Sequence, residues 1–220
     1  MKAVADMTDS LSPIHADAAL LVFDKPSGLL AVPGRGADKQ DCLSARVQAR
    51  YPEAQIVHRL DMATSGLMLF ARGAEMQRQL SMLFAARAVH KRYVAIVAGR
   101  LDAPVETWGE INLPIALDWP KRPLRIIDRE HGKPSVTRYR VLAYDEAVQT
   151  TRVELEPATG RSHQLRVHMQ AIGHPILGDA FYAPEAVRAM ADRLLLHACL
   201  LKLNHPVTGE EVSCESRPPF

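Results

Sequence analysis

The sequence has 220 residues, of which 47% are hydrophobic and 24% charged, a composition typical of one folded globular domain. No apolar run approaches the roughly 20 residues that a membrane-spanning helix needs, and the N-terminus lacks the pattern of a signal peptide, so a cytoplasmic protein is expected. Three widely spaced cysteines without a C-x-x-C pair argue against structural disulfides and a zinc site.

The N-terminal part of the chain predicts an arm, two strands and a helix. Residues 1–18 contain few large apolar side chains and are expected to form a flexible arm before a single domain at 19–220. Leu20–Phe23 and Leu29–Val32 lie on either side of a proline- and glycine-containing turn, a pattern typical of two short strands. Asp41–Arg50 predicts a helix.

Val57–Ala71 (VHRLDMATSGLMLFA) places a single carboxylate, that of Asp61, between an apolar entry and a turn. If the entry is extended, Arg59 and Asp61 share one face. Thr64–Gly66 supplies turn chemistry, and Leu67–Ala71 predicts a buried strand. Asp61 is therefore expected at a strand-to-turn junction, where a scaffold can direct a side chain at a ligand; the alternative is an aspartate that only caps the turn.

Strands and helices alternate irregularly along the rest of the chain. Val136–Ala143 and Thr151–Leu155 are strand candidates joined by polar residues, which favours a strand pair, and Ser162–Ile172 predicts a helix. This grouping favours an α+β fold on a mainly antiparallel sheet with flanking helices. The other predicted elements are a helix at Ala74–Ala88 and strands at Tyr93–Ala98 and Leu194–Leu203.

The distribution of charge is more informative than the net charge of +2. Between Trp119 and Arg140, seven cations face only two acids, and several prolines exclude a long helix. Short strands and exposed loops are expected there, and such a surface suits the backbone of a nucleic acid. The cations are Lys121, Arg122, Arg125, Arg129, Lys133, Arg138 and Arg140.

Four motifs occur in a fixed order: HRLD-x-x-TSG at 58–66, K-x-YVA at 91–95, GRSHQLR-x-H at 160–168 and LLLHA at 194–198. In this order and spacing the sequence resembles the RluA-type pseudouridine synthases, from about residue 20 to the end. The flanking KPSGLLAVPG, DWPKRP and GHPILGDAFY, without an RNA-binding S4 module before the core, match best the small member that modifies both ribosomal and transfer RNA. The resemblance implies the pseudouridine synthase fold, a long mixed sheet with a central cleft.

The resemblance also implies a reaction and the residues that perform it. Uridine becomes pseudouridine when the C1′–N1 bond breaks, the uracil rotates, C5 joins C1′ and the C5 proton leaves. One carboxylate suffices to start this sequence, and no cofactor or metal is expected. Asp61 matches the family's catalytic acid, Arg166 the arginine that pairs with it, and Tyr93 the tyrosine that packs on the target base. Leu195 or Leu196 matches the apolar lining of the pocket.

Substrate binding is assigned to residues around these three. Arg59 matches the family arginine placed to enter the base stack, although pairing with an acid to steady the turn is an alternative use. His58 beside it, and Arg161, His163 and Gln164 at the start of the predicted helix, are expected to contact RNA, helped by free N–H groups at the helix terminus.

The expected partners are an anticodon stem-loop of transfer RNA and a hairpin of large-subunit ribosomal RNA, and the protein is expected to be a monomer. Two alternatives remain from the residues alone: an RNA-binding assembly factor without catalysis, and a hydrolase with an aspartate nucleophile. Release of tritium from C5-labelled uridine distinguishes all three.

Overall fold

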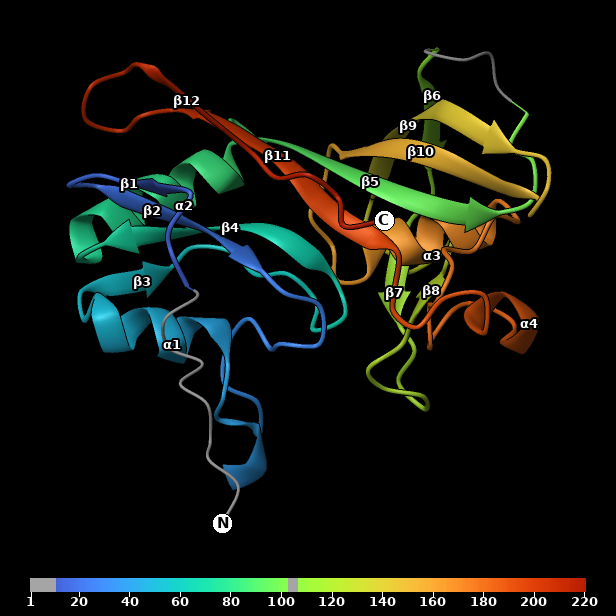
Figure 1. Cartoon of the computed structure of the whole chain (residues 1–220), viewed down its shortest axis with the longest axis horizontal. Coiled ribbons are helices and arrows are strands. Elements are labelled where there is room, and N and C mark those ends of the chain that lie inside the picture. The colour runs from blue at the N-terminus through green and yellow to red at the C-terminus, as the bar shows by residue number, and fades with distance from the viewer. Residues whose placement is uncertain (1–10, 103–106) are drawn as a thin grey trace. The chain divides into compact units, whose positions relative to one another are not determined.

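The computed structural model describes residues 11–102 and 107–220 (Figure 1). The chain divides into two compact units: unit 1, formed by Met1–Val89 and Lys202–Ser216, and unit 2, formed by His90–Leu201 and Arg217–Phe220. The predicted N-terminal arm lies largely outside the described residues. No helix in the described part of the chain is long and apolar enough to cross a membrane.

Unit 1 is a small antiparallel sheet packed against helices. Strand β4 is central, because both β2 and β3 pair with it, and β1 pairs with β2. The apolar residues of these strands and of the first helix form a core that includes Phe23, Leu43 and Phe70, each nearly inaccessible to solvent. The elements are β1 (His15–Ala16), β2 (Leu20–Lys25), η1 (Ala37–Lys39), α1 (Leu43–Arg50), β3 (Ala54–Ile56), β4 (Ser65–Arg72), α2 (Ala74–Ala85) and β12 (Glu211–Glu215).

The predicted strand at Leu29–Val32 is wrong. Only Leu30 forms an isolated bridge, with Cys42. The carbonyl oxygens of Leu30 and Ala31 instead accept hydrogen bonds from the backbone N–H groups of Leu43 and Ser44, at 2.8 and 3.2 Å. The first N–H groups of a helix need such partners, so this segment serves the start of α1 rather than a sheet.

Unit 2 contains a larger sheet in the order β11-β5-β10-β9-β6. The pairs β5–β10, β10–β9 and β9–β6 are antiparallel and lie side by side in Figure 1. The elements are β5 (His90–Ala98), β6 (Gly109–Asn112), β7 (Ile115–Leu117), β8 (Arg125–Ile127), β9 (Val136–Asp145), β10 (Thr150–Pro157), α3 (Gln164–Ala171), α4 (Glu185–Arg188) and β11 (Leu196–Asn204), whose last residues belong to unit 1.

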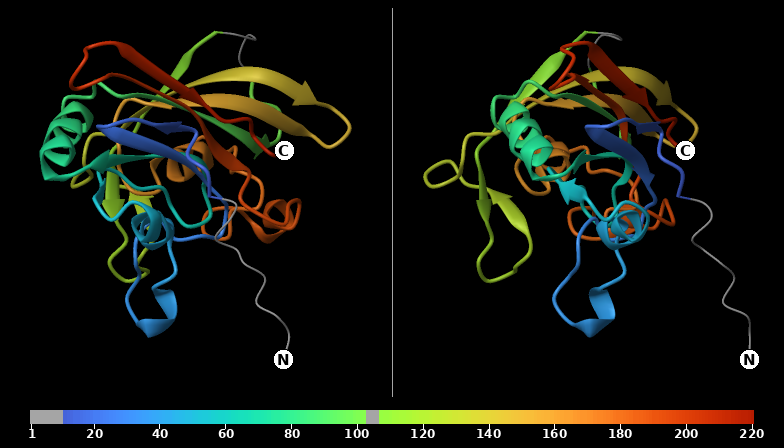
Figure 2. Two further views of the ribbon diagram at one scale, coloured as in Figure 1. Left: turned by 60° about the vertical axis from the view of Figure 1, so that its left-hand side comes forward. Right: turned by 90° about the vertical axis from the view of Figure 1, so that its left-hand side faces the viewer.

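The basic segment contributes to a short hairpin, in agreement with the short strands and loops predicted there. Strands β7 and β8 pair in the register Ile115↔Ile127, Ala116↔Ile126 and Leu117↔Arg125. In the right-hand view of Figure 2 this yellow-green hairpin stands away from the sheet of its unit. Antiparallel strands with helices inserted between them confirm the predicted α+β class; the central cleft stays a prediction.

Candidate active site

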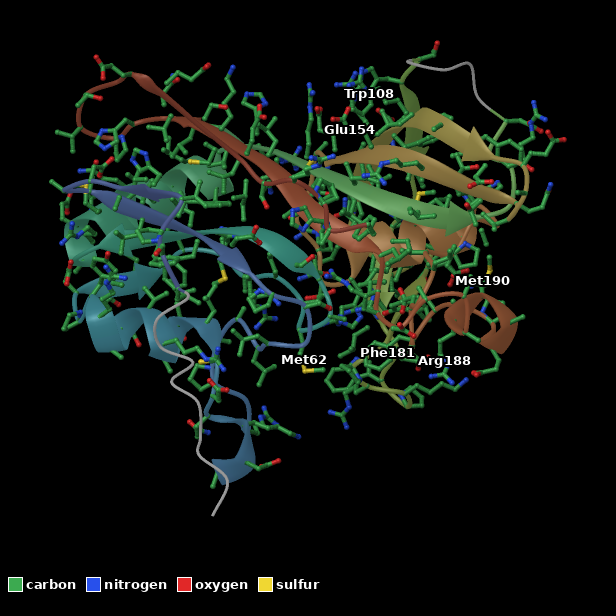
Figure 3. All side chains as sticks on the ribbon, in the orientation of Figure 1. Met62, Trp108, Glu154, Phe181, Arg188 and Met190 are labelled. Carbon is green, nitrogen blue, oxygen red and sulfur yellow. The ribbon has the colours of Figure 1, made fainter. Side chains whose placement is uncertain are left out.

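The acid Asp61 begins a tight turn in unit 1. Its backbone oxygen accepts a hydrogen bond from the N–H of Thr64 at 3.1 Å, and its side chain is half-buried. The turn lies at residues 62–63, not at the predicted 64–66, because Gly66 already pairs with Lys25 of β2. Met62, labelled in Figure 3, is 53% exposed on this turn. Asp61 therefore comes directly before a turn, as predicted, but this turn lies two residues earlier than expected and no strand leads into it.

Three residues of the KPSG segment, Lys25–Gly28, donate hydrogen bonds to this turn. The ammonium of Lys25 donates to the carbonyl oxygen of Met62 at 3.0 Å, and the N–H of Gly28 donates to the same oxygen at 2.9 Å. The Ser27 hydroxyl donates to the carbonyl oxygen of Ala63 at 2.7 Å. A turn fixed by three hydrogen bonds limits the positions that the Asp61 carboxylate can take, which is what a catalytic group requires.

Lys25 is fully buried, an environment that a lysine tolerates only when its charge is well solvated by the protein. Besides Met62, the carbonyl oxygens of Pro26 and Leu29 accept from its ammonium, at 2.9 and 2.8 Å. Sequence reasoning missed this residue, since Lys-Pro-Ser-Gly reads as an exposed turn. The placement of the Lys25 ammonium depends on three oxygens, one of which lies 37 residues away.

The residues before Asp61 are not a strand, yet their exposure alternates. Leu60 is buried, whereas Arg59 is exposed and Asp61 is half-buried. The Nε2 atom of His58 accepts a hydrogen bond from the N–H of Leu69 at 2.9 Å, and its ring stacks on Phe84 with 4.7 Å between centroids. His58 is thus fixed against β4 and α2, while Arg59 is accessible. The predicted RNA contact suits Arg59 better than His58.

Tyr93 lies on strand β5 of unit 2, opposite Leu155 of β10. Side chains two residues apart on a strand share a face, so Lys91 lies on the same side as Tyr93. Both are half-buried, and burial lowers the pKa of the Lys91 ammonium below its usual value. Leu195 is positioned next to this strand, because its backbone oxygen accepts from the N–H of Ile96 at 3.2 Å.

Arg166 forms a buried ion pair that sequence reasoning did not predict. Its Nε and one terminal nitrogen donate to the two carboxylate oxygens of Asp179, at 2.8 and 2.6 Å. Only 4% of the Arg166 side chain and none of the Asp179 side chain is exposed. Asp179 also accepts from the N–H groups of Phe181 and Tyr182. A two-point contact of this kind fixes the plane of the guanidinium.

Two aromatic rings also lie close to the guanidinium of Arg166. Its guanidinium carbon lies 5.1 Å from the ring centroids of both Phe181 and Tyr182, within the range of cation–π attraction. The Tyr182 hydroxyl lies 2.6 Å from Nδ1 of His163 and accepts from the N–H of Arg125 at 2.9 Å. The GDAFY segment therefore positions Arg166 and His163 together, and links them to strand β8.

The other residues predicted on helix α3 differ in their accessibility. The side-chain amide of Gln164 forms all its hydrogen bonds within the protein. Its oxygen accepts from the Thr159 hydroxyl and from the backbone N–H of Arg161. Its nitrogen donates to the carbonyl oxygen of Val136 and to the Thr137 hydroxyl. This leaves Gln164 no free donor or acceptor for RNA. Arg161, three residues before the first residue of the helix, is exposed, and its contact with RNA stays a prediction.

His168, the last residue of the GRSHQLR-x-H motif, is structural. Its Nδ1 lies 2.9 Å from the Thr137 hydroxyl and its Nε2 lies 2.9 Å from the Leu113 carbonyl oxygen. Burial lowers the pKa of His168, although the contact with Leu113 acts in the opposite direction. The ring therefore stays neutral at pH 7 and joins α3 to β9 and to the end of β6.

The predicted residues thus fall into two groups. Unit 1 holds Asp61 with Arg59 and His58 on a turn that the KPSG segment fixes, and unit 2 holds Tyr93, Leu195 and the Arg166 network. That both groups face one substrate stays a prediction of the family resemblance.

Comparison with known proteins identifies the family. Residues 19–171 match the family described as RNA pseudouridylate synthase. The chain belongs to the RNA pseudouridylate synthase family. Among its relatives in that family are the dual-specificity RNA pseudouridine synthase RluA of Escherichia coli K12, 48% identical over 94% of this chain and 93% of the relative, and that of Pasteurella multocida, 48% identical over 96% and 94%.

Solved structures show the same fold as this RNA pseudouridylate synthase. Human RNA pseudouridylate synthase domain containing 1 superposes with a TM-score of 0.80 at 29% identity, covering 100% of this chain and 87% of the human one. Human RNA pseudouridylate synthase domain containing 4 gives 0.75 at 27% identity, covering 96% and 91%. The predicted fold and isomerase activity are confirmed, and the alternative without catalysis is not favoured.

Proposed function

We propose that this RNA pseudouridylate synthase modifies two kinds of RNA, an anticodon stem-loop of transfer RNA and a hairpin of large-subunit ribosomal RNA. The observation that supports this is 48% identity, over nearly the whole of both chains, to enzymes named dual-specificity RNA pseudouridine synthases. The order of the four motifs and the KPSGLLAVPG, DWPKRP and GHPILGDAFY segments agree with it. We place the enzyme in the cytoplasm as a monomer, with one catalytic domain over 19–220.

In this proposal Asp61 starts the reaction, either as a nucleophile on the sugar or base or as the base that removes a sugar proton. Arg166 pairs with Asp61 and keeps it ionised away from water, because a buried carboxylate without a cation tends to take up a proton. Tyr93 packs on the uracil and accepts the C5 proton, and Leu195 lines the apolar wall. The Asp179 pair supports the role of Arg166, since it holds the guanidinium in a single orientation.

A uridine inside a folded loop is out of reach until it is extruded, at a cost of a few kcal/mol for unstacking. Phosphate contacts from exposed cations such as Arg161 and those of the basic hairpin would offset that cost and hold the register. Arg59, exposed and two residues before the acid, would fill the gap that the extruded base leaves.

Release of tritium from C5-labelled uridine in RNA tests the reaction itself, and resistance to EDTA separates it from metal-dependent hydrolysis. For the substrates, we expect mass-spectrometric mapping in a deletion strain to show uridine in place of pseudouridine in two RNAs, one transfer and one ribosomal. Both sites should regain pseudouridine when the wild-type gene is returned. A single affected RNA would remove the dual specificity and keep the family activity.

The role of Arg59 leads to a separate prediction. If it fills the gap in the stack, Arg59→Ala should slow modification of a structured hairpin about tenfold or more, yet hardly affect an RNA whose target is already unstacked. Single-turnover rates on the two RNAs measure the difference, with Arg35→Ala as an exposed arginine control in the same unit. Equal losses on both substrates would instead assign Arg59 to steadying the turn.

A further inference from the structure

The turn of the β7–β8 hairpin exposes a large aromatic side chain among cations. Trp119 is 66% exposed and Ile126, on β8, is 42% exposed. Residues 119–127 (WPKRPLRII) carry three cations and no acid. Large apolar groups that remain in water usually mark a contact surface, and cations interleaved with an aromatic ring suit single-stranded nucleic acid.

The turn is held in shape by its own hydrogen bonds. The N–H of Asp118 donates to the carbonyl oxygen of Leu124 at 3.0 Å, and the N–H of Leu124 donates to that of Lys121 at 3.0 Å. The Asp118 carboxylate accepts from the N–H of Lys121 at 3.2 Å. Trp119 therefore projects from a fixed turn, so little conformational entropy would be lost when a ligand stacks on it.

The charge next to Trp119 is available to a ligand. The guanidinium carbon of Arg122 lies 4.9 Å from the indole centroid, and both Arg122 and Lys121 are exposed. A guanidinium that lies over an aromatic ring can bind a phosphate along its edge at the same time. The one acid of the turn, Asp118, is already bound to a backbone N–H.

The second tryptophan, Trp108, also lies among arginines, but these arginines are paired with acids. The guanidinium carbons of Arg92, Arg138 and Arg140 lie 4.8–5.8 Å from the Trp108 ring. These arginines pair with Glu154 and Glu156 on β10; Trp108 and Glu154 are labelled in Figure 3. Arg92 adjoins Tyr93 on β5, so this network lies on the opposite face of the sheet from the predicted catalytic tyrosine. Each of these three arginines thus has a carboxylate partner, whereas residues 119–127 contain no acid.

We propose that Trp119 is a platform on which an unpaired base of the RNA substrate stacks, with Arg122 and Lys121 on the adjoining phosphates. The inference rests on the proposed function and adds to it a specificity residue outside the catalytic group. A protein partner fits less well. Protein surfaces usually carry both positive and negative charges, whereas residues 119–127 contain three cations and no acid. The base is one that a hairpin loop leaves unstacked, as sequence-specific RNA recognition requires.

The hairpin is also connected to the Arg166 network. The N–H of Arg125 donates to the Tyr182 hydroxyl, and the Tyr182 ring packs against the Arg166 guanidinium. A base held on Trp119 is therefore held at a fixed distance from the arginine assigned to the chemistry. This connection explains why a hairpin tip can set the register of the substrate.

The direct test uses tryptophan fluorescence. The chain has two tryptophans, so Trp108→Phe leaves Trp119 as the only tryptophan, whose emission is excited selectively, and keeps an aromatic ring beside the three arginines. An anticodon stem-loop RNA titrated into this variant should quench the emission, because a stacked base contacts the indole directly. Unchanged emission at RNA concentrations that saturate binding would overturn the proposal.

Affinity gives the second measurement. Trp119→Ala should weaken binding of the same RNA between about 5-fold and about 100-fold, the range expected for the loss of one stacked base. Trp119→Phe should retain most of the affinity, and Arg122→Ala should lower the slope of log Kd against log salt by about 1. The matched control is Val148→Ala, a 54% exposed apolar residue in a turn without cations, which should bind like the wild type.

Abasic substitution in the RNA loop locates the stacked base. One abasic position should weaken binding to the wild type but not to Trp119→Ala, as expected when the two changes remove the same contact. Pseudouridine formation by the wild type on the unmodified RNA is measured in parallel. If the wild type forms pseudouridine and Trp119→Ala binds as tightly as the wild type, the platform is refuted and the proposed function stands. If the wild type forms none, the proposed function fails.

Discussion

Asp61→Asn should abolish turnover, lowering it by roughly 10⁴-fold or more, while RNA affinity stays within a few-fold of the wild type. The carboxylate is assigned to the chemistry, whereas most of the affinity comes from phosphate contacts elsewhere. The turn itself should survive, because its hydrogen bond to Thr64 uses the backbone oxygen of Asp61 and the KPSG contacts go to Met62 and Ala63.

This prediction is checked by tritium release over a long incubation and by filter binding of the same RNA. Asp38→Asn, which neutralises an exposed acid in unit 1, serves as the control and should keep full turnover. Pseudouridine above background with Asp61→Asn would contradict the catalytic assignment. A large loss of affinity without a loss of turnover would make Asp61 a binding residue.

Arg166→Met should lose activity and also destabilise the fold, by about 3–5 kcal/mol in the free energy of unfolding, because it leaves the Asp179 carboxylate buried without its cation. Arg166→Met combined with Asp179→Asn should recover most of that stability, since both charges are removed together. Asparagine keeps an oxygen that can accept from the N–H groups of Phe181 and Tyr182.

The double variant separates stability from chemistry. Denaturant unfolding measures stability. Single-turnover pseudouridine formation, at a temperature where both variants are folded, measures the chemistry. We expect the double variant to be stable and inactive, because it lacks the cation proposed to keep Asp61 ionised. A stable double variant with wild-type turnover would restrict Arg166 to a structural role. Arg188→Met, an exposed arginine paired with Glu185, is the control.

Local patterns of apolar residues in the sequence predicted several strands correctly. The apolar run 67–71 predicted a buried strand and is part of β4, and the strand pair predicted around a polar connection is β9–β10. Such patterns work because a strand or helix buries the side chains that its own periodicity aligns. The strand predicted at 29–32 was wrong although Leu29, Ala31 and Val32 are in the core or packed against it. The carbonyl groups of residues 30 and 31 accept hydrogen bonds from the start of α1 and not from a neighbouring strand.

The placement of buried polar groups was harder to predict. Lys25 and Asp179 both lie in segments quoted for their resemblance, yet neither was assigned a role. A lysine beside Pro-Ser-Gly and an aspartate after glycine are ordinarily exposed turn residues. Gln164, expected to contact RNA, proves to be saturated inside the protein. Burial of such groups depends on partners that the chain brings from elsewhere, and sequence spacing does not reveal those partners.

The sequence by itself determined the family, the α+β class and the segment that carries the proposed acid, because motif order and apolar periodicity are properties of the chain alone. Only the tertiary structure decided how the site residues are held: Lys25 behind the turn of Asp61, and Asp179 paired with Arg166. A buried charge is stable only where several distant groups converge on it, and that convergence exists only in the folded chain.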